Sequence, residues 1–290
     1  MTELRGICTP ICTVFAENNG AVDDNRYRRH LDTLLEAGVH IIAPGGGTGE
    51  FSFLSPDERR HVLEVAAKHI DGRAKIIAHV SAVMTEETIE LAKHAEATGA
   101  DALLVLPPYF EGPNMAGVME HYERVAGAVN TPIMAYNIPV HTGIDLDPEI
   151  CTRLMEMPNI RYLKDSTGDF VRAQDLVQKG VRLFVGGEPI MCHGLLAGAH
   201  GCFWGTSNAI PREAVALYDL VTESKFEQAA ELWNRIYPLN RFVWGNPFNP
   251  GVKAGTNLRG GDVGVCRRPV QPLTAEEHAE LEAIITRLDH

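Results

Sequence analysis

Short apolar runs alternate with amphipathic stretches at a regular interval along most of the chain. Each run has the length of a buried strand, and the stretch after it carries apolar residues at helical spacing. A strand followed by a helix, repeated along the chain, is the pattern of parallel βα units. The eight apolar runs are residues 7–15, 39–43, 75–80, 102–106, 132–136, 160–164, 182–185 and 201–204.

Eight such units predict an α/β fold, a (β/α)8 TIM barrel that closes at about a helix over residues 211–222. After that helix the periodicity is only helical, over residues 226–244 and 275–288, with a Gly- and Pro-rich passage at 245–272 between them. We therefore expect a barrel over residues 1–224 and a C-terminal helical extension over residues 225–290. The sequence Ser55-Pro56-Asp57-Glu58 predicts the start of a helix with a capping box.

Composition excludes several classes of partner. The net charge of −12, with scattered acidic residues, argues against nucleic acid or an anionic membrane. No apolar run reaches membrane-spanning length, and the start, Met1 to Arg5, lacks the pattern of a secretory signal. The six cysteines have no Cys-x-x-Cys spacing and several lie in apolar runs, which predicts buried, reduced thiols. We expect a cytoplasmic location, no metal and no cofactor, since the histidines lack the spacing of a zinc site.

Lys164 is the first candidate for chemistry. Ile160, Tyr162 and Lys164 alternate along one side of the sixth run, and Asp165 to Gly168 then break the strand. A lysine at the end of a barrel strand faces the catalytic end of the fold. Burial favours its neutral amine, which is a nucleophile towards a ketone and predicts a Schiff-base lysine. The alternative interpretation is a lysine whose ammonium reaches out to water.

Two further loops carry unusual residues at the same end of the barrel. Gly46-Gly47-Thr48-Gly49-Glu50 follows the second run, and its free backbone N–H groups are suited to a carboxylate, with the Thr48 hydroxyl as an added donor. Its alternative is a tight turn that requires positive φ. Tyr136 ends the fifth run as Lys164 ends the sixth, so a phenol and a forming imine would meet and exchange protons. The alternative for Tyr136 is an aromatic residue at the barrel rim.

These residues resemble a known family. Gly46 to Glu50, Tyr136-Asn137-Ile138-Pro139 and Lys164-Asp165-Ser166-Thr167-Gly168 resemble the motifs of the dihydrodipicolinate synthase/N-acetylneuraminate lyase family, and residues 266–269, Cys-Arg-Arg-Pro, resemble its lyase and sugar-acid aldolase branches. The resemblance implies a Schiff base between Lys164 and a 2-oxo acid such as pyruvate, with Tyr136 as proton carrier and Thr48 beside the substrate carboxylate. It also implies a homotetramer.

The chain departs from the lysine-pathway synthases of that family at the places where they bind a second substrate. Gly47 replaces a threonine of the loop, Phe110 a tyrosine lent across a subunit interface, and His141 an arginine that binds a carboxylate. A histidine is a poor replacement for the forked guanidinium. The neuraminate lyases bind the sugar chain with acidic residues after the seventh strand. In this chain that position has the sequence Gly-Glu-Pro-Ile, from Gly187 to Ile190, which argues against sialic acid as the substrate. Residues 46–54 resemble instead the keto-deoxy sugar-acid dehydratases and the 4-hydroxy-2-oxo acid aldolases.

We therefore predict a Schiff-base lyase, an aldolase or a dehydratase, that acts on a 2-oxo acid or a keto-deoxy sugar acid. The alternatives are a 4-hydroxy-tetrahydrodipicolinate synthase and a non-catalytic barrel that binds a 2-oxo acid. His79 and Trp204 lie near strand ends, where a role in the second-substrate site and a packing role are both open. The residues expected to bind substrate are Gly46, Gly47, Thr48, Tyr109, His141, Gly187 and Phe203.

Overall fold

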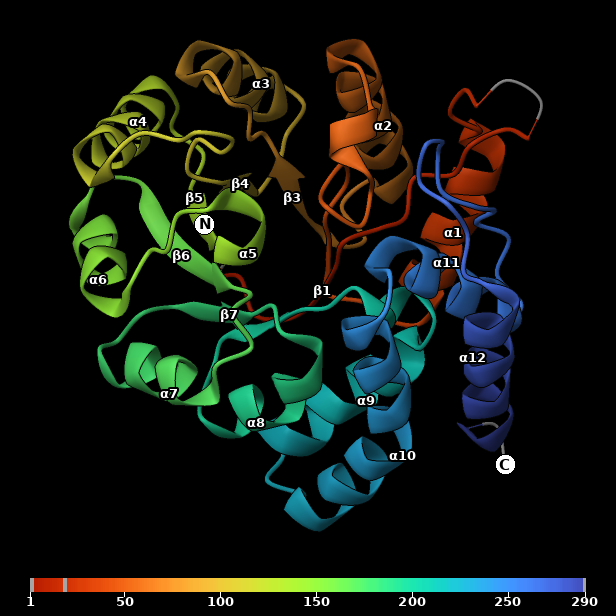
Figure 1. The fold of residues 1–290 in the computed structure, drawn as a ribbon. Coiled ribbons are helices and arrows are strands. Elements are labelled where there is room, and N and C mark those ends of the chain that lie inside the picture. The colour runs from red at the N-terminus through yellow and green to blue at the C-terminus, as the bar shows by residue number, and fades with distance from the viewer. Residues whose placement is uncertain (1–2, 18–19, 289–290) are drawn as a thin grey trace.

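The computed structural model describes residues 3–17 and 20–288, so Met1, Thr2 and the last two residues of the expected extension lie outside it. Eight parallel strands form a closed barrel in sequence order, as the sequence predicts (Figure 1). The strands are β1 (Gly6–Thr9), β2 (Ile41–Ile42), β3 (Lys75–His79), β4 (Ala102–Val105), β5 (Ile133–Asn137), β6 (Ile160–Asp165), β7 (Leu183–Val185) and β8 (Gly201–Phe203).

The strand ends differ from the prediction. β1 stops at Thr9 because Pro10 has no N–H for the ladder. β5 and β6 each run one residue further than the apolar pattern, so Lys164 is the last strand residue but one. The added pair is Asn137 and Asp165, which lie opposite each other in the sheet. Apolar periodicity missed these two positions because their side chains are polar although they are buried.

Helices surround the barrel, each following its strand (Figure 1). The predicted capping box at Ser55 and Glu58 is present at the start of α2, with Pro56 in the first turn. The helices up to β8 are α1 (Asp24–Glu36), α2 (Pro56–Ile70), α3 (Thr85–Ala97), α4 (Met115–Ala128), α5 (Pro139–Thr142), α6 (Pro148–Glu156), α7 (Phe170–Gln178) and α8 (Met191–Leu196). After β8 follow α9 (Pro211–Thr222), α10 (Phe226–Gly245), α11 (Phe248–Leu258) and α12 (Ala275–Leu288).

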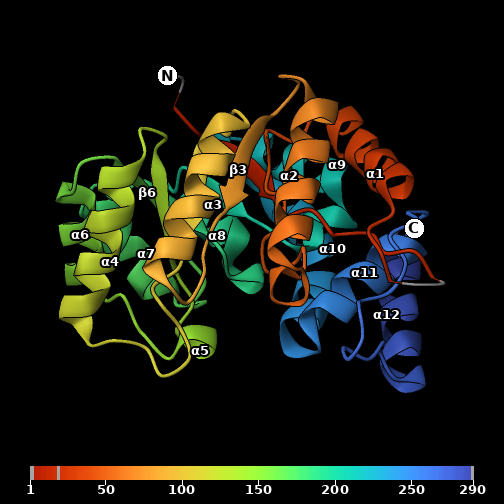
Figure 2. The same cartoon turned by 90° about the horizontal axis from the view of Figure 1, so that it is seen from above.

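The helix α11 lies within residues 245–272, where the sequence showed a Gly- and Pro-rich passage and no helix was predicted. Proline and glycine lower its intrinsic helix propensity, which hides it from the sequence pattern. Tertiary packing overrides that preference, because α11 is buried against its neighbours: Gly251 lies beside Val243 of α10, and Gly255 lies beside Leu239 of the same helix. In Figure 2 the N-terminus lies at one end of the barrel, and α5 and α12 lie toward the other end. Helix α12 therefore lies toward the same end of the barrel as α5, which follows the carboxyl end of β5.

The barrel interior is filled by a layer of side chains separate from the layer between strands and helices. Phe51, Tyr109 and Ile138 pack onto this inner layer. All six cysteines are buried and free. In residues 3–17 and 20–288, no helix is both long and apolar enough to span a membrane.

Candidate active site

Lys164 lies near the end of β6, inside the barrel, with 6% of its surface exposed. Its Nζ is 3.9 Å from the ring centroid of Tyr136 and 3.8 Å from that of Phe203. Over the described part of the chain, no carboxylate lies within ion-pair distance of this ammonium. Lys164 is thus held between two aromatic faces and is free of a charge partner that would compete with reaction.

Tyr136 reaches Lys164 because the two residues are opposite each other in the paired strands β5 and β6. Phe203, at the end of β8, closes the other side of the amine. The structure therefore brings together three side chains that the sequence placed on separate strands. Gly186, which the sequence analysis passed over, makes room for them: a side chain there would place its Cβ 3.1 Å from Lys164 Cε and would overlap the hydroxyl of Ser166.

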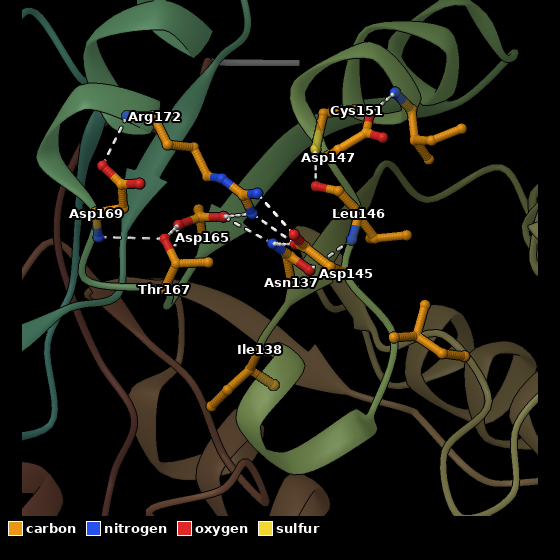
Figure 3. Close-up of polar contacts among 12 residues, drawn as sticks. Asn137, Ile138, Asp145, Leu146, Asp147, Cys151, Asp165, Thr167, Asp169 and Arg172 are labelled. Atoms are coloured by element: carbon orange, nitrogen blue, oxygen red, sulfur yellow. Dashed lines mark hydrogen bonds and ion pairs between the residues drawn. The ribbon is translucent and has the colours of Figure 1, made fainter.

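A polar network lies on the outer side of the same two strands, among the residues that follow the candidate catalytic pair. The Asn137 amide donates to Asp165 Oδ2 at 2.9 Å and to Asp145 Oδ1 at 3.1 Å. Arg172 of α7 donates to both oxygens of Asp145, at 2.6 and 2.7 Å (Figure 3). These hydrogen bonds from the Arg172 guanidinium hold the pKa of the Asp145 carboxyl below its usual value.

This network fixes β5 to β6 beyond their backbone ladder. Asn137 also accepts a hydrogen bond from the backbone N–H of Leu146, and Asp165 accepts two from Thr167. Because neighbouring strand residues point to opposite faces, a fixed Asn137–Asp165 pair outside the barrel sets the register of Tyr136 and Lys164 inside it. The only sequence signal for the network was that a polar residue follows Tyr136 and another follows Lys164.

The glycine loop, residues 45–50, follows β2. Thr48 is 5% exposed, whereas Gly47 beside it is exposed. Among the described residues, the backbone N–H groups of Gly46, Gly47 and Thr48 donate to no protein acceptor. Buried backbone donors are rarely left unpaired, so the N–H groups of the buried Gly46 and Thr48 are suited to an anion. The loop also has positive φ at Gly45 and Glu50, as the alternative interpretation of a tight turn requires.

Glu188 lies after β7 with 1% of its surface exposed. It accepts hydrogen bonds from the backbone N–H groups of Gly205 and Thr206, at 2.8 and 3.3 Å, and from the Thr206 hydroxyl at 2.6 Å. Burial raises the pKa of the Glu188 carboxyl to about 7, although these donors and the nearby Lys164 lower it. Glu188 therefore ties the loop after β7 to the loop after β8.

The other residues predicted from the sequence fall into different surroundings. His141 is exposed on α5, and Tyr109 is half-buried with its ring edge-on to Phe51, centroids 6.2 Å apart. Gly187 approaches the chain at Gly168, where a Cβ would come within 2.8 Å of the Gly168 Cα.

His79 and Trp204 have packing partners in the structure. The His79 ring lies 4.3 Å from that of Phe51, and burial holds the pKa of His79 well below its usual value. Trp204 donates its indole N–H to Asn240 of α10 at 2.6 Å. The Trp204 side chain thus joins the barrel to the extension.

The arrangement is that of a Schiff-base enzyme. A buried amine without an ion-pair partner, a phenol against it and a loop of free amides on the same end of a barrel can bind a 2-oxo acid and convert its carbonyl to an imine. The class that fold and site define is therefore a Schiff-base barrel.

Comparison with known proteins agrees with that class. The model of the dihydrodipicolinate synthetase family matches residues 3–288. The 4-hydroxy-tetrahydrodipicolinate synthase of Brucella abortus is 35% identical over 291 residues, which cover 97% of this chain and 99% of that protein.

Two solved structures with pyruvate have the same fold. A prophage protein of the dihydrodipicolinic acid synthase family from E. coli superposes with a TM-score of 0.94 at 28% identity, and each chain is covered to 99%. The chloride-inhibited dihydrodipicolinate synthase from Acinetobacter baumannii gives 0.93 at 30% identity, again with 99% of each chain. The chain belongs to the dihydrodipicolinate synthetase family. It is a Schiff-base-forming lyase that acts on a 2-oxo acid through an active-site lysine.

Proposed function

We propose that Lys164 is the Schiff-base lysine, that Tyr136 carries protons to and from the forming imine, and that the glycine loop with Thr48 binds the carboxylate of the 2-oxo acid. The observation that carries the proposal is the buried Lys164 amine between the Tyr136 and Phe203 rings, without a carboxylate partner in the described residues.

The chemistry follows from these positions. The neutral amine attacks the ketone carbon to give a carbinolamine, and the Tyr136 phenol donates the proton with which the hydroxyl leaves as water. The resulting iminium withdraws electrons from C3 of the acid. Loss of a proton there gives an enamine, which adds to an aldehyde; the reverse of that addition cleaves a carbon–carbon bond, and loss of a hydroxyl from C4 is a dehydration.

Borohydride reduction with pyruvate tests the assignment of Lys164. The wild type should gain one reduced pyruvate adduct by intact mass, and Lys164→Ala and Lys164→Arg should gain none, because neither side chain is a primary amine. Lys75→Ala is the matched control, since Lys75 opens β3 at the other end of the barrel and pairs with Asp101. A one-site adduct on Lys164→Ala would refute the assignment.

We propose a keto-deoxy sugar acid or a 4-hydroxy-2-oxo acid as the substrate, handled by aldol cleavage or dehydration. The exposed His141 and Gly47 and the missing phenol at Phe110 support this proposal, because none supplies a forked cation or a relay hydroxyl for an amino aldehyde that carries its own carboxylate. A screen of keto-deoxy sugar acids, and of 2-oxo acids paired with aldehydes, identifies the substrate.

Two alternatives have direct tests. The names of the relatives favour a 4-hydroxy-tetrahydrodipicolinate synthase. With His141 in place of the arginine, the bidentate contact to the carboxylate of the amino aldehyde is lost, and such a loss weakens binding by about 2–5 kcal/mol. We therefore expect kcat/KM with pyruvate and aspartate semialdehyde to fall below the usual range of about 10⁴–10⁸ M⁻¹s⁻¹. A barrel that only binds a 2-oxo acid would form the adduct yet turn over no substrate of the screen.

We further propose a homotetramer that works in the cytoplasm, with a barrel over residues 1–224 and a helical extension over residues 225–290. The exposed apolar side chains of Met84, Phe110 and Val140 near the catalytic end support assembly, and the six free, buried cysteines support a reducing compartment. Sedimentation equilibrium measures the assembly, and a monomer at micromolar concentration would contradict it.

A further inference from the structure

The glycine loop is held from outside the barrel by α11, the helix that the sequence pattern did not reveal. Asn249 Nδ2 donates to the backbone oxygen of Gly47 at 2.9 Å. One turn further along α11, Lys253 Nζ lies 2.6 Å from Glu50 Oε1. Two side chains of the extension thus contact the same short loop, one at Gly47 and the other at Glu50.

The contact at Gly47 determines where an amide of the loop points. In a trans peptide, the C=O of one residue and the N–H of the next point in opposite directions. The Gly47 oxygen faces Asn249 and also accepts from the backbone N–H of Glu50 at 3.0 Å. The Thr48 N–H of the same peptide plane is therefore turned away from α11, and it has no protein acceptor among the described residues.

The contact at Glu50 holds the end of the loop. Glu50 has a φ of 59°, a left-handed conformation that is unfavourable for a residue other than glycine. Its carboxylate is buried with Lys253, and its other oxygen accepts the backbone N–H of Arg267 at 2.9 Å. A buried carboxylate needs such partners, so Lys253 and the Arg267 backbone keep Glu50 in this conformation.

We propose that α11 is part of the carboxylate site: Asn249 and the Lys253–Glu50 pair are positioning residues that aim the free amides of the glycine loop at the 2-oxo acid. This inference rests on the proposed function, in which that loop binds the carboxylate. It gives the C-terminal extension a role in substrate binding through residues that touch no substrate atom.

The test compares Asn249→Ala with Asn246→Ala. Asn246 is the matched control, since its side chain donates to the Phe242 oxygen, also at 2.9 Å, in the same extension, and among the described residues it makes no hydrogen bond to the loop. The measurement is the concentration that half-saturates borohydride trapping, for pyruvate and for its uncharged analogue pyruvamide. A lost hydrogen bond changes affinity by about 2- to 12-fold.

We expect Asn249→Ala to need about 3- to 10-fold more pyruvate, and the same pyruvamide within about twofold, because only the carboxylate depends on the aimed amides. Asn249→Asp should need still more pyruvate, since it adds a negative charge and cannot donate. Asn246→Ala should match the wild type with both compounds.

The outcomes separate the two levels of the proposal. A wild type without any pyruvate adduct overturns the proposed function and this inference with it. A wild type that is trapped normally while Asn249→Ala and Asn249→Asp keep its half-saturation overturns the positioning role alone. An equal rise for pyruvate and pyruvamide, or an equal rise in Asn246→Ala, shows a general loss of structure and also overturns that role.

Discussion

The buried carboxyl of Glu188 should make the stability of the protein depend on pH in a way that one substitution can isolate. In the fold, burial raises the pKa of Glu188 from 4.5 to about 7. The folded state therefore binds this proton more tightly than the unfolded chain does. The tighter binding of this proton therefore stabilises the fold fully below pH 4.5, and this stabilisation is lost as the pH rises through 7.

The size of the effect comes from the same two values. A difference of one pKa unit corresponds to about 1.36 kcal/mol, so the whole titration is worth about 3 kcal/mol, of which about 2.5 kcal/mol falls between pH 5 and pH 8. Glu188→Gln keeps the shape of the side chain and does not titrate. The free energy of unfolding of the wild type minus that of Glu188→Gln therefore reports this one group, because the other carboxyls and histidines cancel.

Urea unfolding at pH 5, 6, 7 and 8, followed by circular dichroism, measures that difference. We expect the free energy of unfolding of the wild type, relative to that of Glu188→Gln, to fall steadily by about 2.5 kcal/mol from pH 5 to pH 8. The Gln amide also faces the N–H groups of Gly205 and Thr206, which shifts the difference by a constant amount and leaves its slope unchanged. A difference constant to about 0.5 kcal/mol from pH 5 to pH 8 would refute the burial argument.

Three further substitutions test the parts of the site. Tyr136→Phe should lower turnover by about 10²–10⁴-fold while the pyruvate adduct still forms slowly, and wild-type turnover would rule out the proton-carrying role. Asp145→Asn should lower the free energy of unfolding by about 1–3 kcal/mol, since it breaks a charge-assisted pair with Arg172, and unchanged urea unfolding would show that the pair is not stabilising. Trp204→Phe should lower the melting temperature and leave the half-saturating pyruvate concentration unchanged; the reverse pattern would place Trp204 in the substrate site.

The barrel was predictable because its signal repeats. Each βα unit carries the same change from a short apolar run to an amphipathic helix, and the chain has eight of them, so an error at one unit does not alter the fold. Helix starts such as Ser55 were predictable from local hydrogen-bonding chemistry. Lys164 and Tyr136 could be placed side by side from strand order alone, since consecutive parallel strands are neighbours in the barrel.

What the sequence did not reveal depends on contacts between distant segments. Asn249 reaches Gly47 across about 200 residues of sequence, and no periodic pattern connects them. Helix α11 forms because of what it packs against, which outweighs its proline and glycines. In the sequence, Glu188 was recognisable only as an acidic residue after a strand. Its role in joining two loops depends on hydrogen-bond donors from the loop after β8.

Burial divides the candidate site into two parts, an interior part and an exposed rim. Lys164, Tyr136 and Thr48 are all buried, and strand register places Lys164 opposite Tyr136, so a change at any of the three disturbs buried packing. Phe110, by contrast, is 81% exposed, and His141 lies exposed on α5. These outer positions, where the chain departs from the lysine-pathway synthases, can change without cost to the fold. Under the proposed function, we therefore expect substitutions at the buried positions to change imine formation with the 2-oxo acid, and substitutions at the exposed rim to change the choice of second substrate.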